Sequence, residues 1–321
     1  MDYERVAREL LRHLRGRRSQ VAWSRRLGYR SNVAYAWESG RRWPTAAETL
    51  RACTRTGIDL NASFERFYGK PPTWVGTVDP TQPEAVALLL NDLRGNATVT
   101  DLAQRAERSR YRVTRWLSGQ TQPRLPDFLR LIEAASVRLV DFIAALVEPT
   151  AIPSIAGLWR RIEARRLGAS RHPWSQAVLR CLELQDYQAL PAHDPQWIAH
   201  RLRRPVDEVE SCIELLAESG AIRRVGPHLR PRAIAVDTRL RPEVGRQLKA
   251  HWTRVAAERI EANEHGQYSY NVFTVSRADF EAIRALHLAY FHNLRQVVAA
   301  SKTDEVVAVA NVQLFPLSEN A

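Results

Sequence analysis

Cysteine, lysine and long apolar runs are all scarce in this sequence. Cys53, Cys181 and Cys212 are its only cysteines. They lack the paired spacing of zinc ligands, and they are scattered and odd in number, which does not suggest a disulfide framework. We therefore expect small buried side chains and no metal. No apolar run approaches the ~20 residues that cross a bilayer. The charged start MDYERVAREL lacks the apolar core of a signal peptide. The sequence predicts a cytoplasmic protein without a membrane partner.

Motifs of catalysis are also missing. The sequence has no GxGxxG, GxxxxGK(S/T), HExxH or GxSxG pattern. Its histidines, such as His172, His193, His200 and His228, are spread without ligand spacing and are interpreted as surface or capping residues. We therefore expect no catalytic residues and no cofactor.

Positive charge is the main compositional excess. The formal net charge is +12, the sequence pI is about 10.2, and 44 of the 47 basic residues are arginine. Such a surplus favours an anionic partner, either nucleic acid or an anionic membrane surface. Arginine binds phosphates and guanine edges in a bidentate manner. A genome that prefers arginine codons would also give many arginines, but the positive charge of the protein would be the same.

The sequence contains an imperfect internal repeat. The segment SQVAWSRRLGYRSNVAYAWESGRRWP (19–44) returns as TVTDLAQRAERSRYRVTRWLSGQTQP (98–123). Trp37 aligns with Trp116 and Gly40 with Gly119, at a constant offset of 79 residues. Two repeats are too few for a solenoid, so they indicate two copies of one small domain.

Each copy has the apolar spacing and stop signals of five helices. In the first copy we expect helices at about 3–14, 20–27 and 31–38, a fourth that opens at Pro44 or Thr45, and a fifth around Phe64. The second copy follows the same plan through Leu146. The segment 69–83, rich in proline and glycine, is predicted to be a linker. It could extend to at most ~50 Å, which exceeds one ~34–36 Å turn of DNA.

The central helices of each copy fit a helix-turn-helix. This motif needs apolar side chains behind its second helix and polar ones in front. The predicted buried sets are Leu27, Ala34 and Trp37 in the first copy, and Ala106, Val113 and Trp116 in the second. We expect Ser31 or Arg30 to cap the first reading helix and Ser109 the second.

The pattern Q-x-x-x-(S/A)-x-x-L-G, followed by W-E-x-G-x-x-x-P, resembles the lambda-repressor-like family of the Cro/Xre type. The resemblance spans residues 3–147 and is more complete in the first copy. The second copy departs from it at Glu107, where the turn usually has glycine, and at Val99, which stands where the first copy has Gln20. A glutamate in a left-handed turn costs roughly 1 kcal/mol.

The resemblance implies that the third helix of each copy enters the major groove of duplex DNA. Its implied base-reading residues are Ser31, Asn32, Tyr35 and Ala36 in the first copy, and Arg110, Tyr111, Thr114 and Arg115 in the second. Its implied phosphate-binding residues are Gln20, Arg30, Arg41, Arg42 and Gln120. The alternative is that one copy has lost DNA contact and serves only in dimer packing.

Residues 173–232 show the element order of a winged helix, with helices at 174–187, 195–202 and 205–219 before a hairpin-like segment, IRRVGPHLRPR. The last helix carries five carboxylates and no lysine or arginine. Phosphate repels such a helix, so protein contact is favoured over DNA reading. The arginines of the hairpin favour the opposite interpretation.

The C-terminal part is expected to contain a helix at 241–262, then strands at 268–275 and 305–315 around a helix at 277–300. With the ending VQLFPLSEN, residues 154–318 resemble a domain-of-unknown-function family found behind helix-turn-helix segments in bacterial regulators. The resemblance supplies no chemistry.

These patterns predict a mainly α protein with two tandem five-helix Cro/Xre-type domains, a winged-helix-like domain and a small α/β C-terminal unit. The expected boundaries are 1–68, 69–83 for the linker, 84–148, 154–235 and 236–321. The expected function is bacterial transcription regulation on double-stranded DNA, with a homodimer as the expected assembly. The C-terminal half is expected either to mediate dimerisation or to sense a protein or small-molecule effector. The alternative is a protein-interaction adaptor or antitoxin-like regulatory partner.

Overall fold

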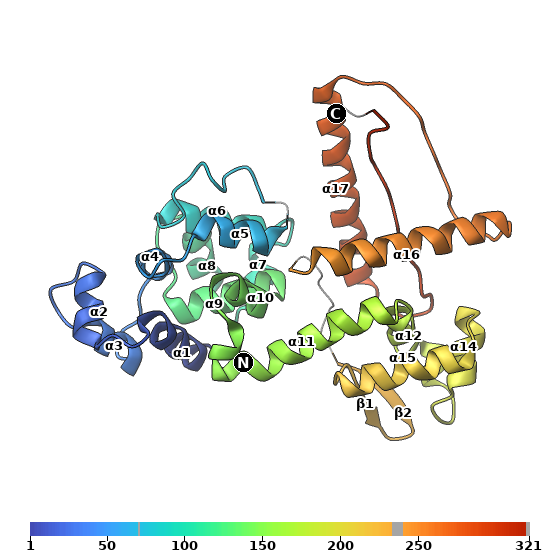
Figure 1. Cartoon of the computed structure of the whole chain (residues 1–321), viewed down its shortest axis with the longest axis horizontal. Helices are drawn as coiled ribbons and strands as arrows, with labels where there is room; N and C mark the ends of the chain where they lie inside the picture. Colours follow the sequence, from blue (N-terminus) through green and yellow to red (C-terminus); the bar gives the residue numbers. More distant parts are fainter. Residues whose placement is uncertain (70, 233–239, 319–321) are drawn as a thin grey trace. The chain divides into compact units, whose positions relative to one another are not determined.

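The computed structural model describes residues 1–69, 71–232 and 240–318 (Figure 1). The chain divides into two compact units, Met1–Ile162 and Glu163–Ala321. Helices dominate both units, and the described residues contain a single sheet of two strands. The mainly helical class expected from the sequence is therefore confirmed.

The first unit contains both repeats as five helices each. The first repeat forms α1 (Tyr3–Arg15), α2 (Gln20–Arg26), α3 (Val33–Ser39), α4 (Ala46–Arg55) and α5 (Leu60–Tyr68). The second repeat forms α6 (Pro83–Arg94), α7 (Val99–Arg105), α8 (Arg110–Leu117), α9 (Leu125–Ser136) and α10 (Leu139–Leu146). A 3-10 turn, η1 (Pro149–Ala151), follows. The expected helix order is confirmed because local signals set most helix ends, such as the Thr45–Glu48 capping box that opens α4.

The caps of α3 and α8, the two helices expected to read DNA, differ from each other. Ser109 caps α8 as expected, with its side chain accepting from the Arg112 amide. Helix α3 begins at Val33, two residues later than expected, because the Asn32 side chain is the cap and accepts from the Tyr35 amide. Neither Ser31 nor Arg30 is therefore the cap. Asparagine provides the same acceptor as serine at this position.

The two repeats share one hydrophobic core. Phe142 of α10 packs edge-on against Phe67 of α5, with ring centroids 5.5 Å apart. It also stacks on Phe64 at 6.3 Å. Helix α1 packs against α9, and α4 packs against α6. The boundaries 1–68 and 84–148 therefore delimit two repeats of one packed unit, because apolar faces of each repeat are buried by the other.

Equivalent segments of the two repeats also pair with each other. The Ala46 amide donates to the Pro123 carbonyl over 3.0 Å, and the Leu125 amide donates to the Pro44 carbonyl over 2.8 Å. Thr45 and Arg124, which are 79 residues apart, are the two residues of this antiparallel bridge. Reciprocal contacts between equivalent positions are the mark of a two-fold relation. The repeats are therefore related here by a local two-fold axis within one chain.

The remaining elements begin with α11 (Pro153–Arg171). They continue as α12 (Ser175–Cys181), α13 (Gln185–Gln188), α14 (Pro195–Leu202), α15 (Val206–Glu218), β1 (Ile222–Val225), β2 (His228–Pro231), α16 (Pro242–Glu261) and α17 (Arg277–Ala300). Strands β1 and β2 are antiparallel, with Arg223 opposite Arg230. The expected domain boundary at 235/236 lies outside the described residues.

A separate core holds the second unit together. Helix α15 packs against α12 and α14, and Val178, Ile198 and Val209 are buried between them. The buried Tyr187 hydroxyl accepts from the Leu229 amide over 3.1 Å, which attaches β2 to this core. The hairpin is thus fixed to the helical core of the second unit.

The expected strands at 268–275 and 305–315 were wrong. Both segments are described as irregular chain, and neither joins a sheet. An alternating apolar pattern becomes a strand only when another strand satisfies its backbone groups. The later segment instead contacts helices. The Glu305 carbonyl accepts from Arg201 Nη2 over 3.1 Å, and Asn311 Nδ2 donates to the Thr253 hydroxyl over 3.1 Å. The expected α/β character of this unit is therefore corrected to helix with extended chain.

Candidate nucleic-acid interface

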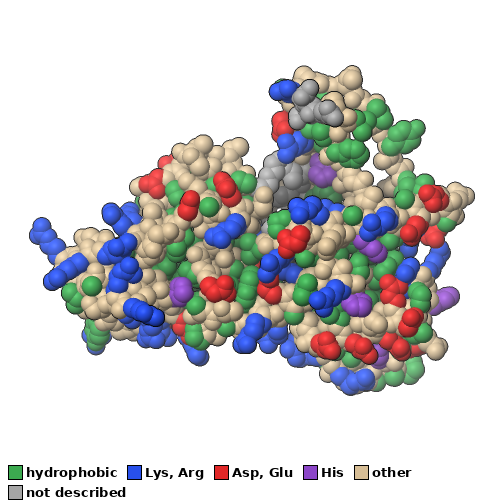
Figure 2. Space-filling view, in the orientation of Figure 1, with side chains coloured by type: hydrophobic (Ala, Val, Ile, Leu, Met, Phe, Trp, Pro, Cys, Tyr) green, Lys and Arg blue, Asp and Glu red, His purple; other side chains and the backbone are tan. Residues whose placement is uncertain are grey.

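Positive charge is concentrated in the first unit. Residues 1–162 contain 26 lysines and arginines against 16 acidic residues, whereas residues 163–321 contain 21 against 19. The first unit therefore carries +10 of the net +12. Figure 2 shows blue side chains gathered over the end of this unit that contains α2 and α3. This unit has the charge that an anionic partner requires.

Helix α8 presents a polar row beside a buried apolar one. Val113 is fully buried and Trp116 is 7 % exposed, while Arg110 and Tyr111 are exposed. The Arg115 guanidinium lies 5.5 Å from the centre of the Tyr111 ring. The structure records no hydrogen bond or ion pair for the Arg110 side chain among the described residues. Arg110 is therefore available to a ligand, and Tyr111 holds Arg115 in place.

The rest of the row expected on α8 is Thr114, which is exposed. Its hydroxyl donates to the Arg110 carbonyl of the preceding turn over 2.9 Å. This bond fixes the rotamer of Thr114 and leaves the hydroxyl oxygen free to accept.

Helix α3 presents a smaller row. Ala34 and Trp37 are buried at 0 % and 2 % exposure. Ser31 and Tyr35 are exposed, and Ala36 is half-buried. The α3 row therefore carries no cation of its own, unlike the α8 row.

Asn32 has a structural task that limits its expected role. Its side-chain oxygen accepts from the Tyr35 amide and lies 3.3 Å from the Ser24 hydroxyl. Bidentate reading of adenine needs both the oxygen and the nitrogen of an amide side chain. Asn32 would have to give up its capping bond to make that contact.

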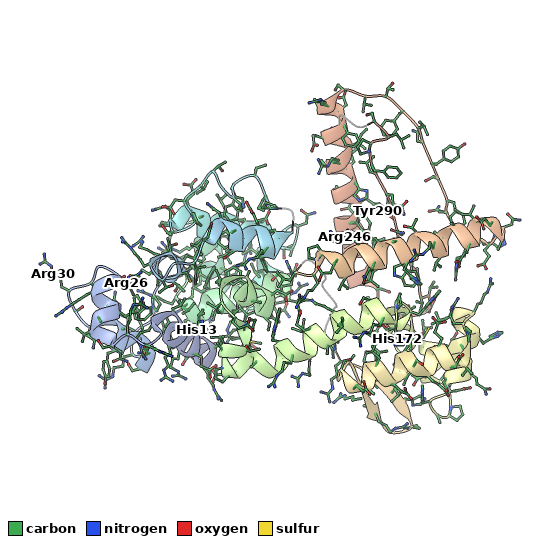
Figure 3. All side chains as sticks on the ribbon, viewed as in Figure 1. His13, Arg26, Arg30, His172, Arg246 and Tyr290 are labelled. Atoms are coloured by element: carbon green, nitrogen blue, oxygen red, sulfur yellow. The ribbon has the colours of Figure 1, made fainter. Side chains whose placement is uncertain are left out.

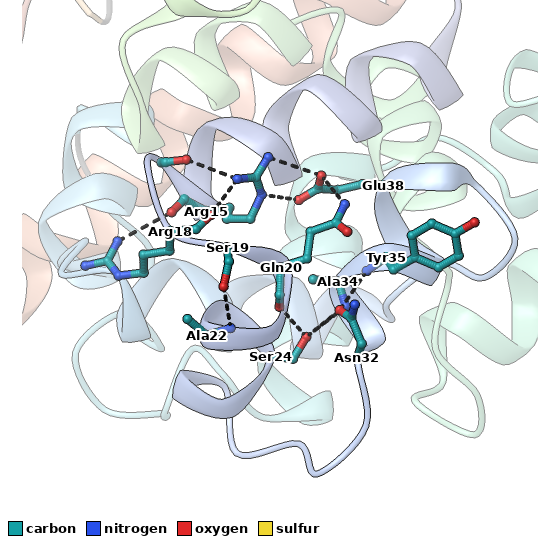
Figure 4. A network of polar contacts seen from close by, with 11 residues as sticks. Arg15, Arg18, Ser19, Gln20, Ala22, Ser24, Asn32, Ala34, Tyr35 and Glu38 are labelled. Carbon is teal, nitrogen blue, oxygen red and sulfur yellow. Dashed lines mark hydrogen bonds and ion pairs between the residues drawn. The ribbon is translucent and has the colours of Figure 1, made fainter.

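A polar network connects α3 to the two helices before it (Figure 4). Glu38, only 4 % exposed, accepts from Arg15 Nε over 2.6 Å and from Gln20 Nε2 over 2.9 Å. These contacts connect α1, α2 and α3. Gln20 was expected to bind phosphate, but its amide nitrogen is engaged inside the unit. Sequence reasoning did not assign Glu38 a role, although its place after Trp37 in the repeat was visible.

The second repeat lacks this network, because two of its three residues are replaced by apolar ones. Val99 stands at the position equivalent to Gln20, and Leu117 at the position equivalent to Glu38. Leu117 is 8 % exposed and belongs to the shared core. Arg94, the equivalent of Arg15, has a buried Nε without a hydrogen-bond partner in the described chain. Polar pairing in one repeat thus corresponds to apolar packing in the other.

The turn before each reading helix is attached to the following helix at equivalent positions. The Tyr29 hydroxyl donates to Glu48 over 3.0 Å, and Arg108 Nε donates to Asp127 over 2.6 Å. Burial, then the Glu48 carboxylate, raises the pKa of Tyr29 to about 12. Both repeats therefore fix the reading helix at its start, with different chemistry.

The remaining expected phosphate ligands lie on the surface. Arg30, Arg41, Arg42 and Gln120 are exposed. In Figure 3, Arg30 projects outward from the turn between α2 and α3. Arg41 lies 5.3 Å from the centre of the Tyr35 ring, which places a cation beside the α3 row.

The second unit offers a different surface. Helix α15 carries Asp207, Glu208, Glu210, Glu214 and Glu218 and no basic residue. Helices of this charge repel phosphate. The hairpin β1–β2 is basic, with Arg223, Arg224 and Arg230 exposed. Negative and positive side chains lie on adjacent elements, so the described residues of this unit do not form a single basic face.

The structure offers no alternative chemistry at the cysteines. Burial raises the pKa of Cys53, Cys181 and Cys212 to about 12, which keeps the thiols protonated. The described parts of the chain hold no cluster of three or more potential metal ligands. None of their helices is long and apolar enough to cross a membrane.

Comparison with known proteins gives one match. A family model described as a domain of unknown function (DUF4423) matches residues 156–317, which is half of the chain. No helix-turn-helix family model is found for the chain. No curated protein and no solved structure matches it.

Proposed function

This chain belongs to the DUF4423 family, and from that premise we propose that it is a bacterial transcriptional regulator whose two N-terminal repeats bind duplex DNA. The observation that carries the proposal is the row on α8 formed by exposed Arg110 and Tyr111 and half-buried Arg115, beside buried Val113 and Trp116. This row lies on the unit that holds +10 of the net charge. An exposed basic helix face on a basic unit fits the major groove.

The two reading helices would recognise different bases. Arg110 and Arg115 each suit the O6 and N7 acceptors of guanine. On α3, the methyl group of Ala36 suits a thymine methyl, while Ser31 and Tyr35 supply single hydrogen bonds. Arg30, Arg41, Arg42 and Gln120 would bind phosphates, which fix register without reading sequence.

The local two-fold relation between the repeats supports an inverted arrangement of half-sites. Repeats related by a two-fold axis present their reading helices to the two strands in opposite directions. The shared core and the bridge between Thr45 and Arg124 keep the two helices at one separation. One chain would therefore cover two inverted half-sites at one spacing, and the half-sites would differ in sequence.

The second unit completes the proposal. Helices α12, α14 and α15 followed by the β1–β2 hairpin have the element order of a winged helix. Because α15 is acidic, we assign this winged-helix-like module to protein contact. We include a homodimer, and a protein or small-molecule effector bound by the C-terminal half.

The test combines selection and substitution. Selection from random duplexes should give an enriched site, and the Arg110→Ala/Arg115→Ala chain should bind it at least ~30-fold more weakly, since each bidentate contact contributes roughly 1–3 kcal/mol. The matched control is Arg246→Ala/Arg254→Ala, which removes two exposed arginines from α16 and should change affinity less than threefold. No enriched site, or equal losses in both variants, would reject DNA reading by α8.

A protein-interaction adaptor remains the second candidate because of the five carboxylates on α15. The same variants separate the two functions. The adaptor predicts that Arg110→Ala/Arg115→Ala leaves partner binding and function intact, while Glu210→Lys/Glu214→Lys abolishes them. The regulator predicts loss of promoter binding in the arginine variant.

A further inference from the structure

Exposed apolar side chains are concentrated near the C-terminus. Among the residues whose side chains the structure describes, 23 large hydrophobic residues are exposed, and 15 of these lie between Ile260 and Leu317. They include Tyr270 at 95 %, Val306 at 81 % and Leu317 at 78 % exposure. We call residues 260–318 the C-terminal arm. A stretch this short that exposes so many large apolar groups lacks a covering partner.

Helix α17 contributes an apolar stripe to the arm. Ile283, Tyr290 and Val297 are spaced by seven residues, and Leu286 lies on the same side of the helix. Leu286 is 69 % exposed, Tyr290 46 % and Val297 72 %. Seven-residue spacing of apolar groups is the pattern of a helix that packs along another helix.

The extended segments of the arm have unused pairing capacity. Residues 266–276 contain no charged side chain, and neither do residues 306–318. Val272, Val309 and Phe315 are exposed within them. The only strands in the described chain are β1 and β2, which pair with each other. Alternating, uncharged and unpaired segments are ready to add to another strand.

We propose that the C-terminal arm is the surface through which two copies of this chain associate. The 15 exposed side chains offer on the order of 1,000 Å² of apolar area, which meets the ~800 Å² per partner of a stable interface. This inference gives a location to the homodimer of the proposed function and rests on that part of it. It does not depend on DNA binding.

A second copy fits the arm better than other occupants do. The extended segments lack the cations that nucleic acid requires and the charge that a charged protein partner would match. A second copy of the arm offers a helix with the same apolar stripe and an uncharged extended segment. Both would be buried in one isologous contact. The first turns of α17 carry both signs, with Arg284 paired to Glu281. They suit the polar rim of such an interface.

The experiment is sedimentation equilibrium of the full chain at micromolar concentration. Leu286→Arg/Val297→Arg places two charges on the stripe, and both positions are exposed in the single chain, so the fold should be unaffected. The matched control is Leu167→Arg/Val225→Arg, two exposed apolar residues outside the arm. The wild type and the control should have twice the 36.6 kDa chain mass, and the arm variant should have the single chain mass with an unchanged circular dichroism spectrum.

The outcomes separate the inference from the function it extends. A wild type that stays at 36.6 kDa overturns both the arm interface and the proposed homodimer. A wild type that pairs while the arm variant also pairs overturns the arm alone. A second variant, Val272→Pro, removes a strand donor without adding charge, and its failure to weaken pairing would exclude residues 266–276 from the interface.

Discussion

At the scale of single residues, the repeat offers internal comparisons. Tyr29 and Arg108 occupy equivalent positions and both contact the next helix, although one is a phenol and the other a guanidinium. The exposed row of α8 could be predicted, because helical spacing assigns Val113 and Trp116 to the inside. The role of Glu38 could not be predicted, because its partners come from two other helices.

Gly28 and Glu107 provide a reciprocal test of one backbone conformation. Both have left-handed φ values, +91° and +51°. Glu107→Gly should stabilise the chain by up to ~1 kcal/mol, because glycine removes the left-handed strain. The exposed pair of Glu107 with Arg130 offsets this by at most ~0.5 kcal/mol. Denaturant unfolding of the Glu107→Gly chain measures the net change in the free energy of unfolding.

Gly28→Glu is the reverse substitution and should destabilise the chain by about 1 kcal/mol. A Cβ at Gly28 would meet no atom within 4 Å, so backbone strain alone is measured. Equal and unchanged unfolding midpoints for both variants would contradict the assignment of strain to these turns.

At the scale of elements, the helices were predictable and the pairings were not. Caps and glycine stops lie in the sequence beside the helix that they end, as with Ser109 before α8 and Gly40 after α3. The strands expected at 268–275 and 305–315 needed distant partners that periodicity does not specify. The shared core of the two repeats was missed for the same reason, since the proline-rich segment 69–83 indicated separate domains.

The bridge between the repeats can be tested with proline. Ala46→Pro removes the amide that donates to the Pro123 carbonyl and places ring carbons against that oxygen. Proline is itself compatible with the first position of a helix, so α4 remains intact. We expect a loss of about 1–3 kcal/mol in the free energy of unfolding.

Arg110→Pro is the control for this change. It also introduces proline at the first position of a helix, after a residue in extended conformation, but no bond between repeats is lost. Its stability should stay within about 0.5 kcal/mol of wild type. If both prolines cost the same, the bridge contributes nothing to the stability of the unit.

At the scale of the whole molecule, the uneven charge distribution is the main feature. The first unit carries most of the basic surplus, and the second carries 21 basic against 19 acidic residues. The total charge could be counted in advance, but its assignment to one packed unit required the division of the chain in the structure. Affinity for DNA should therefore depend on the first unit.

Salt dependence measures this electrostatic contribution. If one chain neutralises ~8 phosphates, the logarithm of the association constant should fall against the logarithm of salt concentration with a slope near −7. Fluorescence anisotropy on the selected duplex over a range of sodium chloride gives the slope. The Arg246→Ala/Arg254→Ala control should keep the same slope. A flat dependence for the wild type would rule out phosphate-driven binding.

The bridge at Thr45 and Arg124 joins two halves that are not the same. A regulator made of two identical halves binds a palindromic site equally well in either orientation. In the proposed complex, Arg110 and Arg115 on α8 and Ser31 and Ala36 beside and on α3 contact half-sites of different sequence. The protein would then bind an asymmetric site in a single orientation.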